Sequence, residues 1–258
     1  MQSACVPGIS IVIPAWNEED RLARTLDRYL PALESRKEPF EVIVVVDGMD
    51  DRTADVAASY SARGVRVLRF PHRLGKGGAV LAGVRVSRYD YVGYLDADGP
   101  ISPEQMYGLV AYLREVDCVV ASRWMRGASG VEAEPLFNRV AGRAWNILTR
   151  SLLFLPIRDT QCGAKFFKGP VARSLLRTVT LTNRAFDVDV LYHVRKDGRR
   201  VIEIPVNWNH DRDTRLPIGR AIPVMFMSIV AVRLMNSPLG RHVPSKLVSW
   251  FERELGES

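Results

Sequence analysis

Residues 91–99 read YVGYLDADG, an apolar run that ends in two aspartates one residue apart. A short apolar run predicts a buried β-strand, and ligands of open α/β sheets bind at the carboxyl ends of the strands. Mg²⁺ and Mn²⁺ take oxygen ligands and usually combine one or two carboxylates with water and substrate phosphates. Asp96 and Asp98 are therefore candidate metal ligands. Neither is needed to cap the next helix, because residues 102–105 (SPEQ) already supply a complete cap.

The first half of the chain alternates short apolar runs with segments of helical periodicity. The apolar runs predict strands at residues 9–13, 42–46, 65–70, 91–95 and 118–121. Helical periodicity marks residues 19–33, 53–63 and 103–114. This alternation is typical of an α/β domain with a mostly parallel central sheet flanked by helices. We expect one such domain at residues 1–210 and a C-terminal helical extension at residues 211–258.

The composition narrows the class of protein and its partners. The 258 residues are 47% hydrophobic and carry a net charge of +7, which fits a globular protein with anionic partners such as nucleotides, nucleic acid or an acidic membrane. Cys5, Cys118 and Cys162 have no CxxC spacing, so neither a disulfide framework nor a structural zinc site is predicted. We expect a reducing, cytoplasmic setting. The N-terminus lacks the pattern of a signal peptide, and no apolar run reaches the ~20 residues that a spanning helix needs.

A polar segment follows each predicted strand. These segments are residues 14–19, 47–51, 73–79, 96–99 and 122–123. Because the carboxyl ends of parallel strands meet at one sheet edge, we expect the segments to converge there. In residues 75–78 (GKGG), a glycine-rich loop would let backbone amides and Lys76 approach an anion. The loop matches neither the GxxxxGK[ST] nor the GxGxxG pattern, and by itself a simple turn explains it as well.

The chain carries the motifs IPAWNEE at residues 13–19, GKGGA at 75–79 and DADG at 96–99. Taken together and in this order, these motifs resemble those of the family 2 glycosyltransferases, which have the Rossmann-like GT-A fold. Further motifs, DTQCGAKF at 159–166, RAFDVD at 184–189 and VNW at 206–208, resemble the dolichyl-phosphate glucosyltransferase branch, with the dolichyl-phosphate mannose synthases as near relatives. After the second strand the family usually has two aspartates followed by Gly-Ser, whereas this chain has Val46 and Met49. The departure leaves the identity of the nucleotide base open.

The resemblance implies inverting transfer of a hexose from a nucleotide-diphosphate sugar, UDP-glucose or GDP-mannose, to a polyprenyl or dolichyl phosphate. Mg²⁺ or Mn²⁺ on Asp96 and Asp98 would stabilise the negative charge that develops on the leaving diphosphate. The implied donor contacts are Pro14, Ala15, Asn17, Glu18, Asp47, Lys76, Gly77, Asp96, Ala97 and Gln161. The implied catalytic group consists of Asp98, Asp187, Asp189 and two candidate phosphate cations, Arg123 and Lys165.

The acceptor decides whether the site needs a general base. A lipid phosphate has a second pKa of about 6 and arrives largely as a dianion, whereas a sugar hydroxyl needs a base. Asp187 and Asp189 are the candidates, and two residues apart on a predicted helix they face different sides, so we favour Asp187. Two alternatives stay open: transfer to a hydroxyl acceptor, and a non-catalytic nucleotide-sugar or nucleic-acid binding module. Nucleic acid is disfavoured because the aromatic residues do not interleave with a basic stripe.

Two segments bear on the membrane. Residues 137–155 have an apolar face and a basic face at helical spacing, and residues 221–235 are apolar nearly all round but too short to span. Packing on the protein's own core and binding at a membrane interface both explain such segments. With a lipid acceptor, we expect a peripheral protein on the cytoplasmic face of an anionic membrane. The basic residues concerned are Arg139, Arg143, Arg150, Arg212, Arg215 and Arg220.

Overall fold

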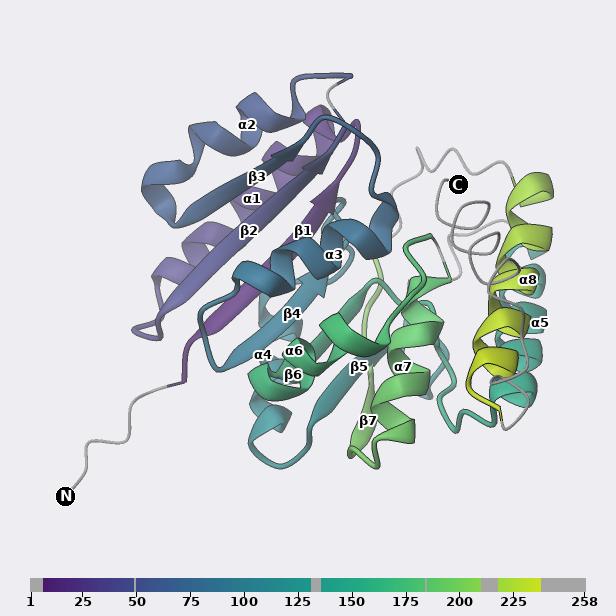
Figure 1. Ribbon diagram of the computed structural model, residues 1–258. Helices are drawn as coiled ribbons and strands as arrows, with labels where there is room; N and C mark the ends of the chain where they lie inside the picture. The colour runs from purple at the N-terminus through teal and green to yellow at the C-terminus, as the bar shows by residue number, and fades with distance from the viewer. Residues whose placement is uncertain (1–6, 49, 131–135, 184, 210–217, 238–258) are drawn as a thin grey trace.

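The computed structural model describes residues 7–48, 50–130, 136–183, 185–209 and 218–237. Their centre is a sheet with strand order β3-β2-β1-β4-β6-β5-β7 (Figure 1). The strands are β1 Ile9–Ala15, β2 Phe40–Asp47, β3 Val65–Phe70, β4 Tyr91–Leu95, β5 Cys118–Ser122, β6 Ala164–Lys168 and β7 Val201–Pro205. Strand β6 is antiparallel to both of its neighbours, and the other pairs are parallel. The predicted mostly parallel α/β sheet is confirmed.

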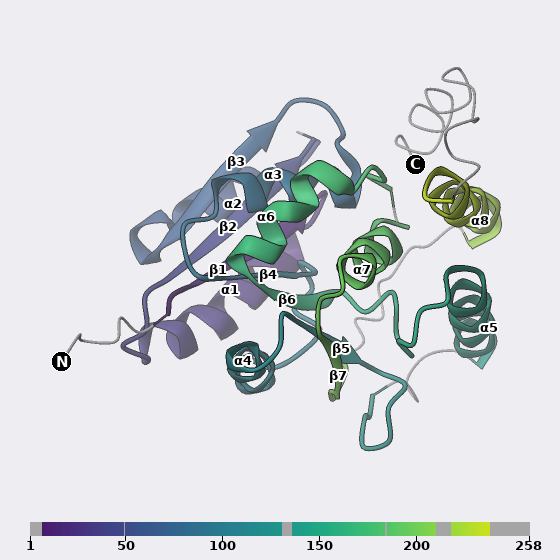
Figure 2. The same cartoon turned by 60° about the horizontal axis from the view of Figure 1, so that its bottom comes forward.

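Helices cover both faces of the sheet (Figure 2). They are α1 Glu19–Glu34, α2 Thr53–Ser59, α3 Gly75–Val86, α4 Pro103–Ala111, α5 Leu136–Leu153, α6 Gly169–Thr178, α7 Phe186–Lys196 and α8 Ile218–Met235. Helices α1, α2 and α4 share one core with the sheet, and α3, α6 and α7 share the other. Helix α8 packs against α5 and α7, beside the β5–β7 side of the sheet.

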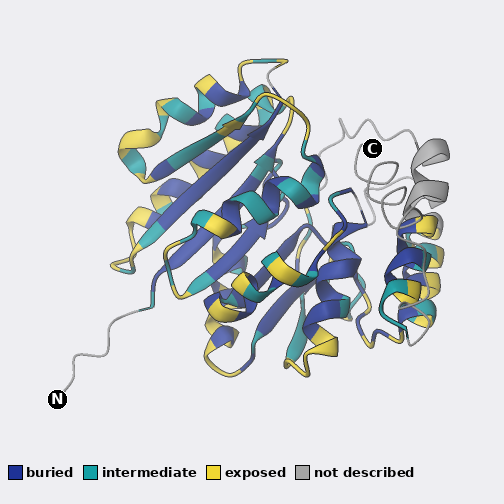
Figure 3. Ribbon diagram, in the orientation of Figure 1, coloured by how far each residue is buried: buried dark blue, intermediate teal, exposed yellow. Residues whose placement is uncertain are grey.

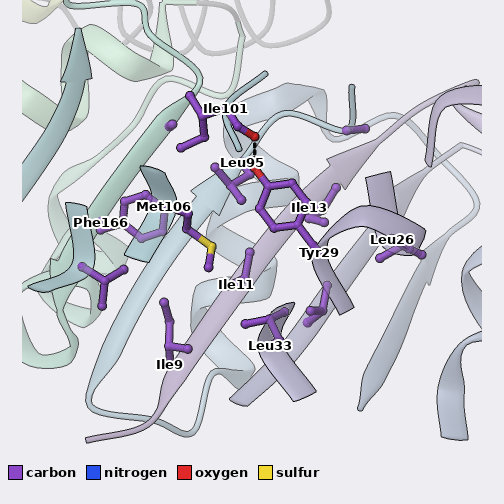
Figure 4. Packing of buried hydrophobic residues seen from close by; sticks show 14 of the residues in the cluster. Ile9, Ile11, Ile13, Leu26, Tyr29, Leu33, Leu95, Ile101, Met106 and Phe166 are labelled. Atoms are coloured by element: carbon purple, nitrogen blue, oxygen red, sulfur yellow. Dashed lines mark hydrogen bonds between the residues drawn. The ribbon is translucent and has the colours of Figure 1, made fainter. Parts of the chain in front are cut away.

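The two cores follow from the alternation of side chains along each strand. Ile9, Ile11 and Ile13 of β1 point into the core under α1, where the Tyr29 hydroxyl donates a hydrogen bond to the Ile101 carbonyl at 2.6 Å (Figure 4). Val12 points into the opposite core. Both faces of the central strands are therefore buried (Figure 3), which accounts for their nearly continuous valine and isoleucine content.

The sequence predicted five of these strands, and all five are present. It missed β6 and β7. The predicted helix at residues 53–63 is shorter, because α2 ends at Ser59 and a separate 3₁₀ turn spans Ser61–Arg63. The predicted cap is present: the Ser102 hydroxyl accepts a hydrogen bond from the Gln105 amide, and the Gln105 side chain accepts one from the Ser102 amide. Cys118 and Cys162 are buried free thiols.

The GKGG segment corrects an expectation. It is not a loop, because α3 begins at Gly75 and includes Lys76 and Gly77 in its first turn. Glycine is a poor helix former, but this helix lies too close to its neighbours for larger residues. A Cβ atom on Gly77 would overlap Phe186, and one on Gly83 would overlap Val12.

The C-terminal part is described only for α8. The expected boundary at residues 210–211 lies outside the described residues, as do Met49, Arg184, Arg212, Arg215 and residues 238–258. Among the described helices, none combines the length and the hydropathy that crossing a bilayer requires.

Gly93 gives a test of how tightly β4 packs on β6. A Cβ atom at this position would overlap the Phe166 ring on the paired strand. We expect Gly93→Ala to lower the free energy of unfolding by about 1–3 kcal/mol through overpacking, measured by urea denaturation. Gly108→Ala in α4 is the matched control, because its Cβ would meet no atom within 4 Å, and it should stabilise by up to about 1 kcal/mol. Equal stability of Gly93→Ala and wild type would contradict the packing described.

Candidate active site

The DADG segment is fixed at the carboxyl end of β4. The Asp96 amide donates a hydrogen bond to the Gly163 carbonyl at 3.1 Å. A Cβ atom on Gly163 would overlap the Asp96 carboxylate, so the glycine leaves room for that side chain. On the other side, the Thr25 hydroxyl donates to the Ala97 carbonyl at 2.8 Å, and the Arg28 guanidinium donates to the Gly99 carbonyl. Helix α1 and the segment before β6 thus hold the two aspartates in place.

Asp96 belongs to a largely buried cluster of charged and polar side chains. The Lys76 ammonium is 2.9 Å from Asp96 Oδ1 and 3.0 Å from Asp187 Oδ2. Lys165 is fully buried and donates to Asp187 Oδ1 at 2.5 Å and to the Cys162 carbonyl at 2.7 Å. The Tyr94 hydroxyl donates to Asp187 Oδ1 at 2.7 Å. We call Lys76, Tyr94, Asp96, Lys165 and Asp187 the lysine–aspartate cluster; its two ammonium groups balance its two carboxylates.

The cluster fixes the ionisation of its members. Burial alone would raise the pKa of Asp187, but the charges of Lys165 and Lys76 and the hydrogen bonds that it accepts lower this pKa to about 2. Burial likewise disfavours the charged form of Lys76, yet Asp187 and Asp96 raise the pKa of Lys76 above its ordinary value. Asp187 is therefore a carboxylate, and Lys76 an ammonium ion, throughout the neutral range.

Glu18 adds a third carboxylate near Asp96 and Asp98. Its pKa is raised to about 7, first because it is partly buried and then because of the charges of Asp98 and Asp96; the Arg21 ion pair opposes the rise. The negative charges of Asp98 and Asp96 thus act on Glu18, and a cation bound beside them would offset this repulsion. Within the described residues, no three His, Cys, Asp or Glu side chains are arranged to hold a metal by themselves. Carboxylate oxygens such as those of Asp96 and Asp98 suit an ion that takes its other ligands from water and phosphate.

A second polar group gathers at the ends of β1 and β2. The buried Asp47 carboxylate accepts a hydrogen bond from the Leu74 amide and lies 3.7 Å from Arg73 Nε. The Arg73 guanidinium lies 3.9 Å over the ring of Trp16, which is 45% exposed. Asn17 follows with a positive φ of 54°, an uncommon conformation for a non-glycine residue. Pro14 is partly buried and Ala15 is buried in β1.

Arg123 is held by a partner that the sequence did not reveal. Its Nε and Nη2 lie 2.8 and 3.0 Å from the two oxygens of Asp159, which is fully buried. The guanidinium also lies 5.0 Å from the Trp208 ring. A bidentate pair of this kind fixes the orientation of the guanidinium.

Comparison with known proteins identifies the family. The model of glycosyl transferase family 2 matches residues 10–176. The chain belongs to this family. It is 31% identical to the dolichyl-phosphate beta-glucosyltransferase of Dictyostelium discoideum, over 87% of this chain and 73% of that protein. It is 34% identical to the glycosyltransferase AglD of Haloferax volcanii over 83% of this chain, but spans only 35% of AglD.

Solved glycosyltransferases share the fold. Mannosyl-3-phosphoglycerate synthase from Rubrobacter xylanophilus superposes with a TM-score of 0.70 at 22% identity, covering 88% of this chain and 74% of that one. Glucosyl-3-phosphoglycerate synthase from Mycobacterium tuberculosis, crystallised with Mn²⁺, UDP and phosphoglyceric acid, gives 0.65 at 21% identity, covering 88% and 78%. The chain is thus a glycosyltransferase with the expected GT-A fold.

Within this family 2 fold, the sequence-derived site residues divide into two groups. In the structure Lys76 contacts both Asp96 and Asp187, and the charge of Asp98 acts on Glu18. Lys165 does not reach the surface: both of its contacts are internal, so it positions Asp187 rather than meeting a phosphate.

Two other residues are turned away from the expected site. The Gly77 amide donates to the Thr182 carbonyl at 2.7 Å, and a Cβ atom on Gly77 would overlap Phe186, so Gly77 packs against the segment that leads into α7. The Asp189 carboxylate accepts from the Thr180 and Leu181 amides at 2.9 and 3.1 Å and lies 3.2 Å from His193. Successive helical residues turn by about 100°, so Asp187 and Asp189 lie on opposite sides of α7. Asp189 holds the segment before α7 in place and does not reach the lysine–aspartate cluster.

Near the end of β5 lies a group of buried donors of which the sequence singled out Gln161 and missed the others. Within the described part of the chain, six buried side-chain donors have no hydrogen-bond partner: Ser122 Oγ, Trp124 Nε1, Trp145 Nε1, Thr149 Oγ1, Arg150 Nε and Gln161 Nε2. Helix α5 meets residues 160–161 here, because Asn146 accepts hydrogen bonds from the Thr160 amide and hydroxyl. A buried donor without a partner costs about 1–3 kcal/mol, so the region favours ligand or water oxygens.

Asp187 predicts a specific acid dependence of stability. Its folded pKa of about 2 lies below the ordinary 3.8, so its contribution to the free energy of unfolding is present above about pH 4 and is lost as the pH falls toward 2. At pH 7 we expect Asp187→Asn to cost about 3–5 kcal/mol, because it leaves buried ammonium groups uncompensated. This difference from wild type should shrink by roughly 2 kcal/mol between pH 5 and pH 2.

Urea denaturation at a series of pH values measures this difference. Asp55→Asn is the control, because Asp55 is exposed and only weakly paired with Arg69 at 3.5 Å; it should follow the wild-type curve. A difference between wild type and Asp187→Asn that stays constant from pH 5 to the lowest pH studied would contradict the assigned ionisation.

Proposed function

We propose that this glycosyltransferase transfers a hexose from a nucleotide-diphosphate sugar to a polyprenyl or dolichyl phosphate, with inversion at the anomeric carbon. The observation that carries the proposal is the state of Asp187. The carboxylate that would serve as general base is saturated by Lys76, Lys165 and Tyr94 and has a pKa of about 2. Of the two carboxylates that the sequence offers as a base, Asp187 is thus too acidic to take up a proton at neutral pH, and Asp189 is turned away.

An acceptor that is already an anion needs no base. A phosphate monoester has a second pKa of about 6, so one of its oxygens can attack the anomeric carbon directly. The bond from that carbon to the diphosphate oxygen breaks as the new bond forms, and the electron pair leaves with the nucleoside diphosphate. No proton has to be removed from the acceptor. This argument favours the lipid phosphate over a hydroxyl acceptor, which is the second candidate.

The relatives agree with this acceptor. The Dictyostelium protein is named for dolichyl phosphate and glucose, and we therefore propose UDP-glucose as the first donor to test and GDP-mannose as the second. On the donor side, Trp16, Arg73 and Asp47 form a polar and aromatic group that suits a nucleoside. Val46, where the family usually has aspartate, removes one carboxylate from it.

We further propose a divalent cation, Mg²⁺ or Mn²⁺, on Asp96 and Asp98. When bound, such an ion acts as a Lewis acid toward the leaving diphosphate. The chain's own residues do the rest: Lys76 places a second positive charge at the diphosphate end, and Arg123, fixed by Asp159, orients negatively charged oxygens. The buried donors of Trp124, Trp145 and Gln161 suit the oxygens of the acceptor phosphate or sugar.

The membrane proposal rests on α5 and α8. Large apolar side chains are exposed on both helices, with Ile147 at 62% and Phe226 at 39%, and Phe154, just after α5, is 75% exposed. On α5 the polar Asn146 is buried instead, at 6%. A helix that hides a polar residue and exposes apolar ones suits an interface with lipid. We propose that these helices, with the 211–258 extension, dock on the cytoplasmic face of an anionic membrane.

The acceptor is tested by product assays with each donor and either polyprenyl phosphate or the corresponding polyprenol, in Mg²⁺ and in Mn²⁺. We expect a glycolipid with the phosphate alone. Asp98→Ala should lower its formation by at least about 100-fold while the fold is retained. Free sugar as the sole product with every donor, or equal transfer to the polyprenol, would refute the acceptor class.

The pH dependence separates the acceptor's ionisation from the enzyme's. For a phosphate acceptor, kcat/KM for the acceptor should fall below about pH 6, where the dianion takes up a proton. A difluoromethylene phosphonate acceptor, whose second pKa is lower, should move that fall to lower pH. If kcat/KM falls at the same pH with both acceptors, the fall belongs to an ionising group of the enzyme. That result would contradict the proposal that the acceptor dianion is the attacking form.

Flotation with vesicles of phosphatidylcholine and phosphatidylserine tests the membrane proposal. Wild type should float, and the double variant Ile147→Glu/Phe226→Glu should remain at the bottom, because charge on these helices opposes insertion. Tyr112→Glu is the control, since Tyr112 is 44% exposed but follows α4; it should float like wild type. Wild type that stays at the bottom at both low and moderate salt would exclude this docking surface.

A further inference from the structure

We propose that Lys76 acts as the resident counter-ion of Asp96 and thereby makes divalent-metal binding depend on the arrival of the donor's diphosphate. The inference rests on the proposed function, in which Asp96 is a metal ligand and the sugar donor carries a diphosphate. It adds that the metal binds tightly only together with the diphosphate, and it attributes this dependence to the Lys76 side chain.

The geometry places Lys76 between two unlike carboxylates. Its Nζ is 2.9 Å from Asp96 Oδ1 and 3.0 Å from Asp187 Oδ2. The Asp187 side chain is 3% exposed, the Asp96 side chain 33% and the Lys76 side chain 24%. The ammonium group therefore bridges from a buried anion to one that ligands in solution can reach.

The buried side of this bridge is fixed. Asp187 is also held by Lys165 and Tyr94, and the first turn of α3 is anchored by the Gly77–Thr182 hydrogen bond. The Lys76 ammonium group lies within ion-pair distance of both carboxylates, 2.9 Å from Asp96 and 3.0 Å from Asp187. Only the contact with Asp96 lies on the exposed side, so this is the contact that an incoming ion must compete for.

Competition follows from charge. A divalent ion on Asp96 would share a carboxylate with an ammonium group, and two cations so close repel one another in a partly buried site. The enzyme without donor therefore binds the metal weakly. A diphosphate supplies negative charge to both cations, so each can then keep a partner. Metal and diphosphate must raise each other's affinity by the same factor, because coupling between two ligands is reciprocal.

Two other roles for Lys76 predict different behaviour. If Lys76 only stabilised the fold, its removal would lower stability and leave the metal affinity of the folded protein unchanged. If it only contacted the donor phosphates, its removal would weaken nucleotide binding and again leave the affinity for metal alone unchanged. Tighter metal binding in the absence of nucleotide is expected from the counter-ion role and from neither of the others.

Titration of the full chain with Mn²⁺, followed by the electron paramagnetic resonance of the free ion, measures this affinity with and without UDP. Wild type should bind Mn²⁺ weakly alone and at least about tenfold more tightly with UDP. Lys76→Met should bind Mn²⁺ alone at least about tenfold more tightly than wild type and show a smaller effect of UDP. Lys76→Arg, which keeps the charge, should behave as wild type.

Lys168→Met is the matched control. Lys168 is paired with Asp117 at 3.3 Å and lies at the other end of β6, opposite Tyr91 at the start of β4, so its loss should leave Mn²⁺ binding unchanged. Lys76→Gln replaces the charge by an amide and serves as the second variant if Lys76→Met does not fold.

The outcomes separate this inference from the function on which it rests. Suppose that UDP strengthens Mn²⁺ binding in wild type, but Lys76→Met and Lys76→Gln bind Mn²⁺ alone no more tightly than wild type. That result would overturn the counter-ion role of Lys76 and leave the proposed function standing. Failure of wild type to bind Mn²⁺ even with UDP would overturn both the metal assignment and the inference.

Discussion

Burial of the Asp187 carboxylate is the constraint on which the rest of this structure depends. A carboxylate removed from water is tolerated only where opposite charges and hydrogen bonds replace its hydration. Here the replacements come from β4, β6 and α3, while Asp187 itself lies in the first turn of α7. Register makes this possible, because antiparallel pairing sets Lys165 opposite Tyr94 and leaves Asp96 two residues beyond. The interaction that joins four elements thus also positions the exposed end of the site.

The same interaction limits the chemistry. An anion held by two ammonium groups is a strong positioning device and a poor base, since the charges that stabilise it also lower its proton affinity. A fold that uses its best-placed carboxylate in this way suits acceptors that arrive already charged. The basic net charge of the chain agrees with partners that carry phosphates. In the proposed reaction, stability and choice of acceptor therefore have one electrostatic cause.

Part of the fold and of the site could be predicted from local sequence patterns. The valine- and isoleucine-rich strands and the DADG motif can be recognised within a few residues, because burial on both sheet faces and a carboxylate pair at the end of a strand are local features. Strand β6 was missed because AKFFK is short and has lysines near both ends, and burial of Lys165 depends on a partner 22 residues away. The contact of Lys76 with Asp187 joins residues 111 apart, and no spacing rule predicts it. Gly77 suggested a loop because its packing partner, Phe186, belongs to a distant helix.

The acceptor side combines the remaining features. Helix α5 presents exposed apolar residues such as Ile147 outward, while Trp145 and Thr149 of the same helix bring unpartnered donors inward. Arg143 lies 5.0 Å from the Trp124 ring, which links this helix to the segment that carries Arg123. A lipid phosphate has the matching division, with an apolar chain and a headgroup rich in acceptor oxygens. In the proposed reaction, α5 separates these two parts: the chain stays with the membrane, and the phosphate reaches donors that the protein itself leaves unpaired.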